Sequence, residues 1–234
     1  MTSIIRILCV GFITMLSASC GGSKNMTAEI NLLKQKKAAI GVVSMSVTDY
    51  GGRLEWTSSA QVSDIIQQNM SDMVETVEGL LAEEWTVTPA STIVDNPGYY
   101  PLSIGRVFEG RTPTYSKSMP HFVTSRRDLV RATLAPDTAQ KLCETLGLDA
   151  VVVVYSEWLV ATGSMIPTSK PLTKNVLAIY DSRGRRLFFG RKDVQGTKTL
   201  GAMGMVKVDE NTIGEWVDAF KSGITDVLAQ MNEG

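Results

Sequence analysis

Two apolar runs constrain the fold of this chain more than any other feature of its sequence. Residues 38–47 and 150–158 are dominated by Val, Ile and Ala, and the only charged residue within them is Glu157. Runs of this kind are typical of strands that are buried on both faces of a sheet. Because such a sheet needs helices on its faces, an α/β protein is predicted.

The helices expected to cover this sheet show amphipathic spacing. Apolar residues recur at steps of three and four along 62–81 and again along 213–231, which places them on one helical face. Ser58, with a glutamine three residues later, has the form of a capping box before the first of these helices. Two shorter helices are predicted over 125–134 and 136–146.

Further strands and a long loop lie between the helices. Residues 86–94 have strand composition. Residues 175–180 and 185–190 are predicted to pair as a hairpin, with Gly184 in the left-handed position of its turn. The stretch 96–122 is rich in Pro and Gly and has no sustained period, so it is predicted to be a long loop inserted in the domain.

The order of these elements defines the fold class. Along the chain the predicted order is β-α-β-α-β-β-β-α. This order predicts an α/β fold of α+β-like type, in which helices cover a mixed sheet of about four to five strands. A length of 234 residues fits one large domain, which is predicted over 38–234.

The amino end has the layout of an export signal. Residues 1–19 contain one basic residue, an apolar run and then small residues, a pattern typical of a cleaved signal peptide. The residues before Cys20 resemble a bacterial lipoprotein lipobox, although Ser17 stands where leucine is usual. The resemblance implies that Cys20 is lipidated. The polar residues that follow it predict a tether over 20–37, which could include a short helix around Ile30, Leu32 and Leu33. Gly21 favours the outer membrane by the sorting rule of such lipoproteins. The other interpretation is that an ordinary signal peptidase cleaves the chain and that the protein is secreted without a lipid.

A family resemblance rests on three segments: the first strand at 39–43, the helix-to-strand join at 146–154 and the hairpin at 176–189. Together they resemble the small periplasmic α/β lipoprotein domains related to the amino-terminal domain of TolB. That group includes the penicillin-binding-protein activator lipoproteins and the curli-secretion lipoprotein. The resemblance implies an assembly or scaffolding role with no catalytic residues.

No motif for a common catalytic chemistry is present. With 23 basic and 24 acidic side chains the net charge is −1, so we expect no generic nucleic-acid binding. The single histidine, His121, cannot supply a histidine-based metal cluster, and the cysteines lack metal-binding spacing, so neither a metal nor a cofactor is expected. Cys143 lies on the apolar face of its helix and is interpreted as a packed thiol.

Charge is distributed unevenly along the chain. Residues 60–84 contain acidic side chains but no Lys or Arg, whereas 106–131 and 183–198 are rich in Arg and Lys. One interpretation is that these are solvated faces. The other is that an acidic helix and a basic face meet partners or neighbouring copies, with anionic lipid headgroups or cell-wall polymers as further binding candidates.

Aromatic residues divide between regular elements and loops. Trp85, Trp158 and Trp216 fall on predicted strands or helices and are assigned to the core. Tyr99 and Tyr100 fall in the long loop, where exposed aromatic residues are candidate contact anchors.

The segment 96–131 is the candidate contact surface. Long loops are usually functional or disordered, and arginine can bind an anionic group through two parallel hydrogen bonds. The alternative is an insertion whose charges only keep it solvated. The candidate contact residues are Tyr99, Tyr100, Arg106, Arg111, Arg126, Arg127 and Arg131.

These observations lead to one expected function and one alternative. We expect a lipid-anchored envelope protein at the periplasmic face of the outer membrane, with soluble periplasmic or surface-exposed forms as alternatives. It would bind an envelope protein, or further copies of itself, in envelope assembly or secretion, without catalysis. The alternative is a periplasmic small-ligand receptor or a hydrolytic enzyme with an unrecognised site.

Overall fold

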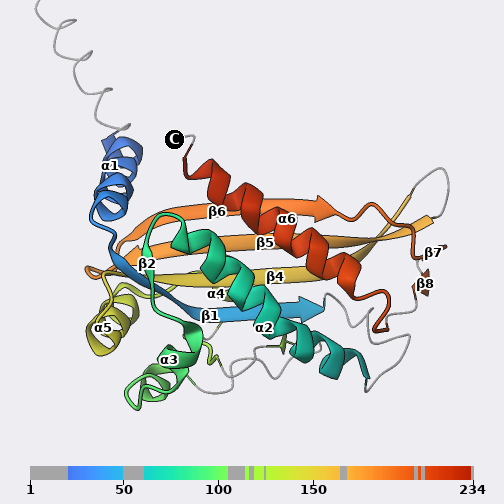
Figure 1. Ribbon diagram of the computed structural model, residues 1–234, viewed down its shortest axis with the longest axis horizontal. Coiled ribbons are helices and arrows are strands. Elements are labelled where there is room, and N and C mark those ends of the chain that lie inside the picture. The colour runs from blue at the N-terminus through green and yellow to red at the C-terminus, as the bar shows by residue number, and fades with distance from the viewer. Residues whose placement is uncertain are drawn as a thin grey trace, which may run out of the picture.

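One mixed β-sheet lies at the centre of the molecule (Figure 1). The computed structural model describes residues 21–49, 61–104, 114–115, 119–123, 125–163, 168–202, 205–206 and 209–232. Its long strands are β1 (Ala39–Asp49), β4 (Ala150–Thr162), β5 (Thr168–Asp181) and β6 (Arg186–Gln195). β1 and β4 run parallel, while β5 is antiparallel to both β4 and β6. The predicted mixed sheet is confirmed.

Four strands of two residues each extend this sheet. They are β2 (Thr86–Val87), β3 (Thr114–Tyr115), β7 (Gly201–Ala202) and β8 (Met205–Val206). β2 and β3 pair with β1, β7 pairs with β5, and β8 pairs with β7. They lengthen the outer parts of the sheet, and its centre remains the four long strands.

Two long helices, α2 (Gln61–Ala82) and α6 (Gly214–Gln230), cover one face of the sheet (Figure 1). The expected apolar face of α6 is buried, and the Trp216 Nε1 atom donates a hydrogen bond of 2.9 Å to the carbonyl oxygen of Leu159. Burying a side chain of this size contributes on the order of 1.5–3 kcal/mol. The core on this face includes Met45, Met73, Val77, Trp85, Trp158, Leu177, Trp216, Phe220 and Ile224, so the three assigned tryptophans are confirmed as core residues.

A buried chain of hydrogen bonds lies beneath α6. Trp158 Nε1 donates to Ser156 Oγ at 3.0 Å, Ser156 Oγ donates to Asn175 Oδ1 at 2.7 Å, and Asn175 Nδ2 donates to Thr173 Oγ1 at 2.9 Å. A Cβ atom at Gly223 of α6 would overlap the Asn175 side chain, so the absence of a side chain there lets the helix approach. Because every member of this chain is paired, polar groups can be buried here without a large penalty.

The described residues cover the opposite face only in part. Helix α5 (Pro136–Leu146) packs on it, and Gly147 ends the helix in the left-handed conformation with φ of 66°. Short helices α3 (Ala90–Val94), η3 (Tyr100–Leu102) and α4 (Arg126–Leu129) lie along the same side. Its core contains Val43, Tyr99, Phe122, Leu142, Cys143, Val153 and Tyr180, which confirms Cys143 as a packed thiol.

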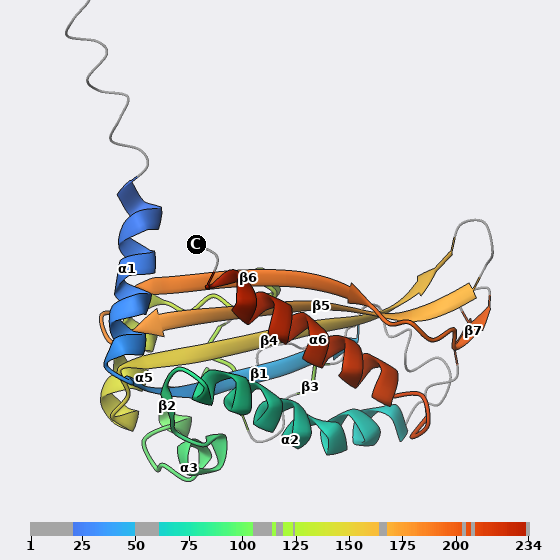
Figure 2. The same ribbon diagram turned by 45° about the horizontal axis from the view of Figure 1, so that its top comes forward.

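The segment expected to be a tether contains a regular helix, α1 (Gly21–Gln35), which extends away from the sheet (Figure 2). Ile30 near its carboxyl end is buried, and the Glu29 carboxylate forms an ion pair of 2.7 Å with Arg185 of the β5–β6 turn. The short helix expected within this segment is present and covers most of it. Its apolar residues Ile30 and Leu33 recur at helical spacing and pack against the core of the sheet.

Two further expectations need correction. The strand predicted over 86–94 stops after Val87, and Pro89 leads into α3, whose first amide, at Ala90, donates to Glu78 Oε1 at 2.5 Å. A carboxylate on α2 thus favours a helix start where composition favoured a strand.

The helix predicted over 125–134 is limited to α4, because Ala132 takes a positive φ of 45° that breaks the helical path. The hairpin is confirmed, with longer strands than expected and with Gly184 at φ of 75°.

No helix in the described ranges is long and apolar enough to cross a membrane. The predicted signal at 1–19 and the lipidation site Cys20 lie outside the described residues. The proposed division of the chain at 20 and 38, and the 96–122 insertion, stay predictions.

Candidate functional site: a basic groove on the open face of the sheet

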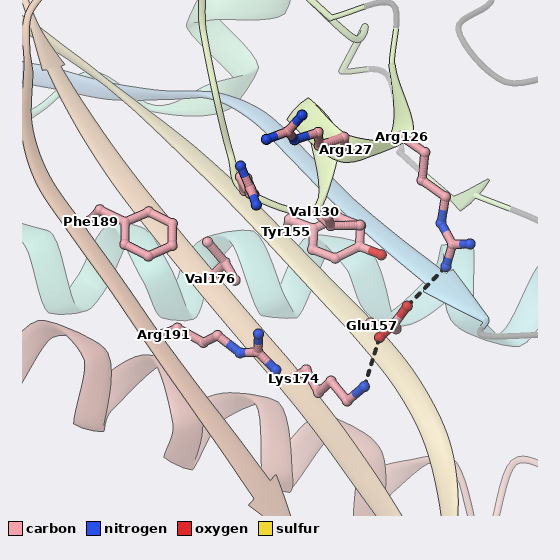
Figure 3. Close-up of a pocket in the computed structure, with 10 residues that line it drawn as sticks. Arg126, Arg127, Val130, Tyr155, Glu157, Lys174, Val176, Phe189 and Arg191 are labelled. Carbon is pink, nitrogen blue, oxygen red and sulfur yellow. Dashed lines mark hydrogen bonds and ion pairs between the residues drawn. The ribbon is translucent and has the colours of Figure 1, made fainter.

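The part of the second face that α5 leaves open is hollowed into a groove between α4 and strands β4 to β6 (Figure 3). Two adjoining hollows of about 580 and 610 Å³ share the side chains of Arg127, Arg131 and Phe189. We call this surface the basic groove. Its residues are Ser125, Arg126, Arg127, Asp128, Val130, Arg131, Thr133, Tyr155, Glu157, Lys174, Val176, Arg186, Phe189 and Arg191.

Strand register builds the floor of the groove. Tyr155 of β4 lies opposite Val176 of β5, which lies opposite Arg191 of β6. The neighbouring row on the same face pairs Glu157 with Lys174. Because alternate residues of a strand point to the same face, these side chains line the groove while their neighbours enter the core under α6.

The wall opposite β6 is α4 and the turn after it. Ser125 caps α4: its Oγ accepts from the Asp128 amide at 3.1 Å and donates to Asp128 Oδ2 at 2.6 Å. The Tyr180 hydroxyl donates to the Ala132 carbonyl oxygen and accepts from the Leu134 amide, both at 3.0 Å. Tyr180 therefore holds the positive-φ turn that follows α4 from inside the core.

The acidic side chains of the groove are already engaged within the protein. Glu157 forms ion pairs with Arg126 and Lys174, both at 3.1 Å (Figure 3). Arg191 pairs with Asp193 at 3.0 Å. These contacts neutralise Glu157. Asp128, the other carboxylate of the groove, bonds Ser125 and forms no ion pair within the described ranges, and the cations outnumber the two carboxylates, so the groove keeps a net positive charge.

Three arginines supply that remaining charge. Arg127, Arg131 and Arg186 form no ion pair within the described part of the chain. The Arg186 guanidinium lies 5.0 Å from the ring centroid of Phe189, a cation–π contact that leaves the ring 42% exposed. We call Arg127, Arg131 and Arg186 the groove arginines; together they make this hollow a site for anionic groups.

A buried hydroxyl also belongs to the groove. Tyr155 is only 2% exposed, and among the described residues its hydroxyl forms no hydrogen bond of good geometry. Burial raises the pKa of Tyr155 to about 12, against the opposing influence of nearby Thr48 and Arg126. The hydroxyl is therefore a neutral donor at physiological pH, directed toward the Arg126–Glu157 end of the groove (Figure 3).

The structure brings together three of the candidate contact residues, Arg126, Arg127 and Arg131, on one wall of the groove. Tyr100 is exposed at 46% on η3. Arg106 and Arg111 lie outside the described residues, as does Cys20.

Tyr99 was assigned to the contact surface and is instead part of the core. It is fully buried, its hydroxyl donates to the Val43 carbonyl oxygen, and its ring contacts Phe122. Burial raises its pKa far above the ordinary tyrosine value. The position of Tyr99 in a predicted loop favoured an exposed ring. The expectation was wrong because η3 turns this ring inward, while the adjacent Tyr100 stays outside.

Several groove residues are not among the predicted contact residues: Tyr155, Glu157, Lys174, Val176, Arg186, Phe189 and Arg191. Arg186 and Arg191 belong to the basic stretch 183–198, but nothing in that stretch indicates that β6 lies near α4. Period-two alternation in β5 and β6 placed Lys174, Val176 and Arg191 on one face, and it was the available signal.

The other reactive side chains do not form a second site. Burial raises the pKa of the Cys143 thiol to about 12, which keeps it protonated. Burial lowers the pKa of His121. In the described ranges no group of His, Cys, Asp and Glu has an arrangement that could hold a metal ion.

Comparison with known proteins gives no family assignment. No protein-family model matches this chain, and no curated protein matches it.

Solved structures with similar folds include lipoprotein GNA1162 from Neisseria meningitidis, at 16% identity, with 84% of this chain and 99% of that chain covered and a TM-score of 0.37. The LpoB C-terminal domain from Salmonella enterica is 12% identical, with 75% and 96% covered and a TM-score of 0.36. A PelC dodecamer from Paraburkholderia phytofirmans is 12% identical, with 83% and 87% covered and a TM-score of 0.35. At such low TM-scores and identities these neighbours support no inference about function.

Proposed function

We propose that this chain is an exported, lipid-anchored envelope protein that acts by binding another envelope protein through the basic groove, without catalysis. The observation that carries the proposal is the set of groove arginines, whose charge no acidic side chain in the described ranges neutralises. Water solvates such cations in the free protein, and an anionic partner gains both binding energy and faster association from them.

The amino-terminal segment supports the envelope location. A signal-like run followed by Cys20 favours lipidation, and three acyl chains would hold the protein far more firmly than one. Gly21 favours the periplasmic face of the outer membrane.

A binding role fits the shape of the site better than the alternative of a small-ligand receptor or hydrolytic enzyme. A receptor or enzyme normally encloses its ligand in a deep pocket with a few convergent polar groups. The basic groove is open along its length and lined by both apolar and cationic side chains. Such a lining is typical of a surface that meets another protein.

The test is an affinity pull-down of the full-length protein, in detergent, from the envelope of its own source. Four forms are compared: the parent, Cys20→Ser, the double variant Arg127→Ala with Arg131→Ala, and the control Arg183→Ala, which removes an exposed arginine of the β5–β6 turn. We expect the parent and the control to recover the same specific proteins, identified by mass spectrometry, and the double variant to lose them. Cys20→Ser should leave the membrane fraction. Equal recovery by the double variant would overturn the proposal.

A further inference from the structure

The shape of the basic groove restricts what can fill it. Its two hollows are continuous through Arg127, Arg131 and Phe189 and measure about 580 and 610 Å³. One water accounts for about 30 Å³ in the liquid, so a single inorganic anion would occupy only a small part of this space. The dimensions therefore favour an elongated ligand.

The groove arginines lie on two different walls. Arg127 and Arg131 belong to the α4 wall, whereas Arg186 belongs to β6. Apolar surface from Val176 and Phe189 lies between these walls on the strands (Figure 3). A ligand that uses both walls must carry separated anionic groups with apolar material between them.

The chemistry of the lining favours a polypeptide over a membrane surface. Among the cations that line the groove, those without an acidic partner in the described ranges are all arginines. Their planar guanidinium matches a carboxylate through two parallel hydrogen bonds. The lysine of the groove, Lys174, is engaged by Glu157. Arginine together with an exposed aromatic ring is also the combination most enriched at the energetic centres of protein interfaces. A bilayer surface is too broad to enter a hollow between a helix and a strand.

We propose that the basic groove binds an extended acidic segment of a partner protein, in which carboxylates on either side of an apolar or aromatic residue pair with the groove arginines while that residue packs on Phe189 and Val176. This inference rests on the proposed function and names the class of ligand for the same site.

The experiment uses the full-length chain in detergent micelles and a phage-displayed library of short random peptides. We expect the peptides selected by the parent to be enriched in Asp and Glu flanking a Leu, Phe, Tyr or Trp. The most enriched peptide, labelled with fluorescein, is then titrated by fluorescence anisotropy. Arg127→Gln combined with Arg131→Gln should weaken its binding about tenfold or more, and Phe189→Ser should also weaken it. Arg183→Gln is the matched control and should bind like the parent.

Further arms separate the competing ligands. The same peptide with Gln and Asn in place of its acidic residues should not bind, and binding of the original peptide should weaken as salt rises. Inorganic phosphate and phosphatidylglycerol vesicles are tested as competitors. Phosphate or vesicles could displace the peptide at a concentration lower than the peptide concentration needed for half-maximal binding. In that case the groove is a phosphate or lipid site, and the inference is overturned. Selection of peptides without acidic enrichment, or equal selection by the double variant, also overturns it.

This outcome is distinguishable from failure of the proposed function. If the envelope pull-down depends on Arg127 and Arg131 but no acidic peptide is selected, the groove binds a partner of other chemistry and only the ligand class is wrong. If acidic peptides bind the groove but the pull-down is unaffected by the double variant, the proposed function is wrong and the peptide-binding property stands by itself.

Discussion

Helix α2 and the basic groove each concentrate charge of one sign, and the fold treats the two regions differently. On α2, Asp72 forms an ion pair of 2.8 Å with Lys221 of α6. In the turn that directly follows α2, Glu84 pairs with Lys34 of α1. Glu78, also on α2, accepts the first amide of α3. These acidic side chains connect α2 to three neighbouring helices.

In the groove, by contrast, the charged side chains that matter have no acidic partner inside the described part of the protein. Arg127, Arg131 and Arg186 have no acidic partner within the described ranges, although Glu157 lies in the same hollow. Glu157 is occupied by two other cations from α4 and β5. The charge of α2 is thus part of the scaffold, while the charge of the groove remains for a ligand. A run of like charge in a sequence therefore indicates a binding surface only after its internal partners are known.

The largest effect is expected from a substitution in α6, the helix that packs on the sheet beneath both regions. Trp216→Ala would empty a fully buried site between α6 and the sheet and remove the hydrogen bond to Leu159. We expect the free energy of unfolding to fall by about 3–5 kcal/mol, measured by denaturant titration followed by circular dichroism. The same loss is expected for Phe220→Ala. A change below about 1 kcal/mol would show that α6 does not hold the sheet.

The next effect concerns the groove wall alone. Tyr180→Phe removes the hydroxyl that bonds Ala132 and Leu134 and should cost about 1–3 kcal/mol, because both backbone groups are left in a buried setting. Partner recovery should fall as well, since the turn that positions Arg131 is released. The ion pairs of α2 should be unaffected, which hydrogen exchange along α2 would check. Unchanged binding in a destabilised variant would show that the wall does not position the arginines.

A pH titration separates the two regions in another way. Burial raises the pKa of Glu78 above its ordinary value of 4.5, so the native state binds the proton more tightly than the unfolded state. The corresponding stabilisation is fully present below the unfolded pKa and is lost as pH rises through the folded pKa. Glu78→Gln should flatten this part of the dependence of stability on pH, measured by thermal unfolding. The double variant Arg127→Gln with Arg131→Gln should leave it as in the parent, because arginine does not titrate there.

The smallest effect sharpens the comparison most directly. Asp72→Asn breaks an exposed ion pair and should cost about 0.2–1 kcal/mol, whereas Arg127→Gln breaks none within the described ranges and should leave stability unchanged. Added salt should reduce the difference between parent and Asp72→Asn. A loss of stability in Arg127→Gln equal to that in Asp72→Asn would mean that the groove charge also serves the scaffold.

Much of the fold could be predicted because its signals are local. The apolar run 150–158 and the periodic helix over 213–231 were predicted at nearly their observed positions, since burial on two faces or on one face leaves a pattern in consecutive residues. The region 86–94 was not, because the helix start at Ala90 depends on Glu78, a carboxylate from another element.

The site was less accessible to prediction for a similar reason. Arg126, Arg127 and Arg131 could be chosen because they are clustered in sequence, but their role depends on which carboxylates the fold brings to them. Phe189 and Arg186 come from a strand that meets α4 only in three dimensions. Tyr99 and Tyr100 are adjacent and chemically identical, and only the path of η3 decides which ring is buried.

Helix α1 has a consequence for how such a surface would meet its target. It is 15 residues long, and at 1.5 Å of rise per residue it is a strut of about 22 Å rather than a flexible cord. Glu29 and Ile30 hold its carboxyl end against the sheet. If Cys20 is lipidated, as we propose, the length of this helix limits how far from the bilayer the groove can lie. A partner within that distance would then meet the groove at a high local concentration.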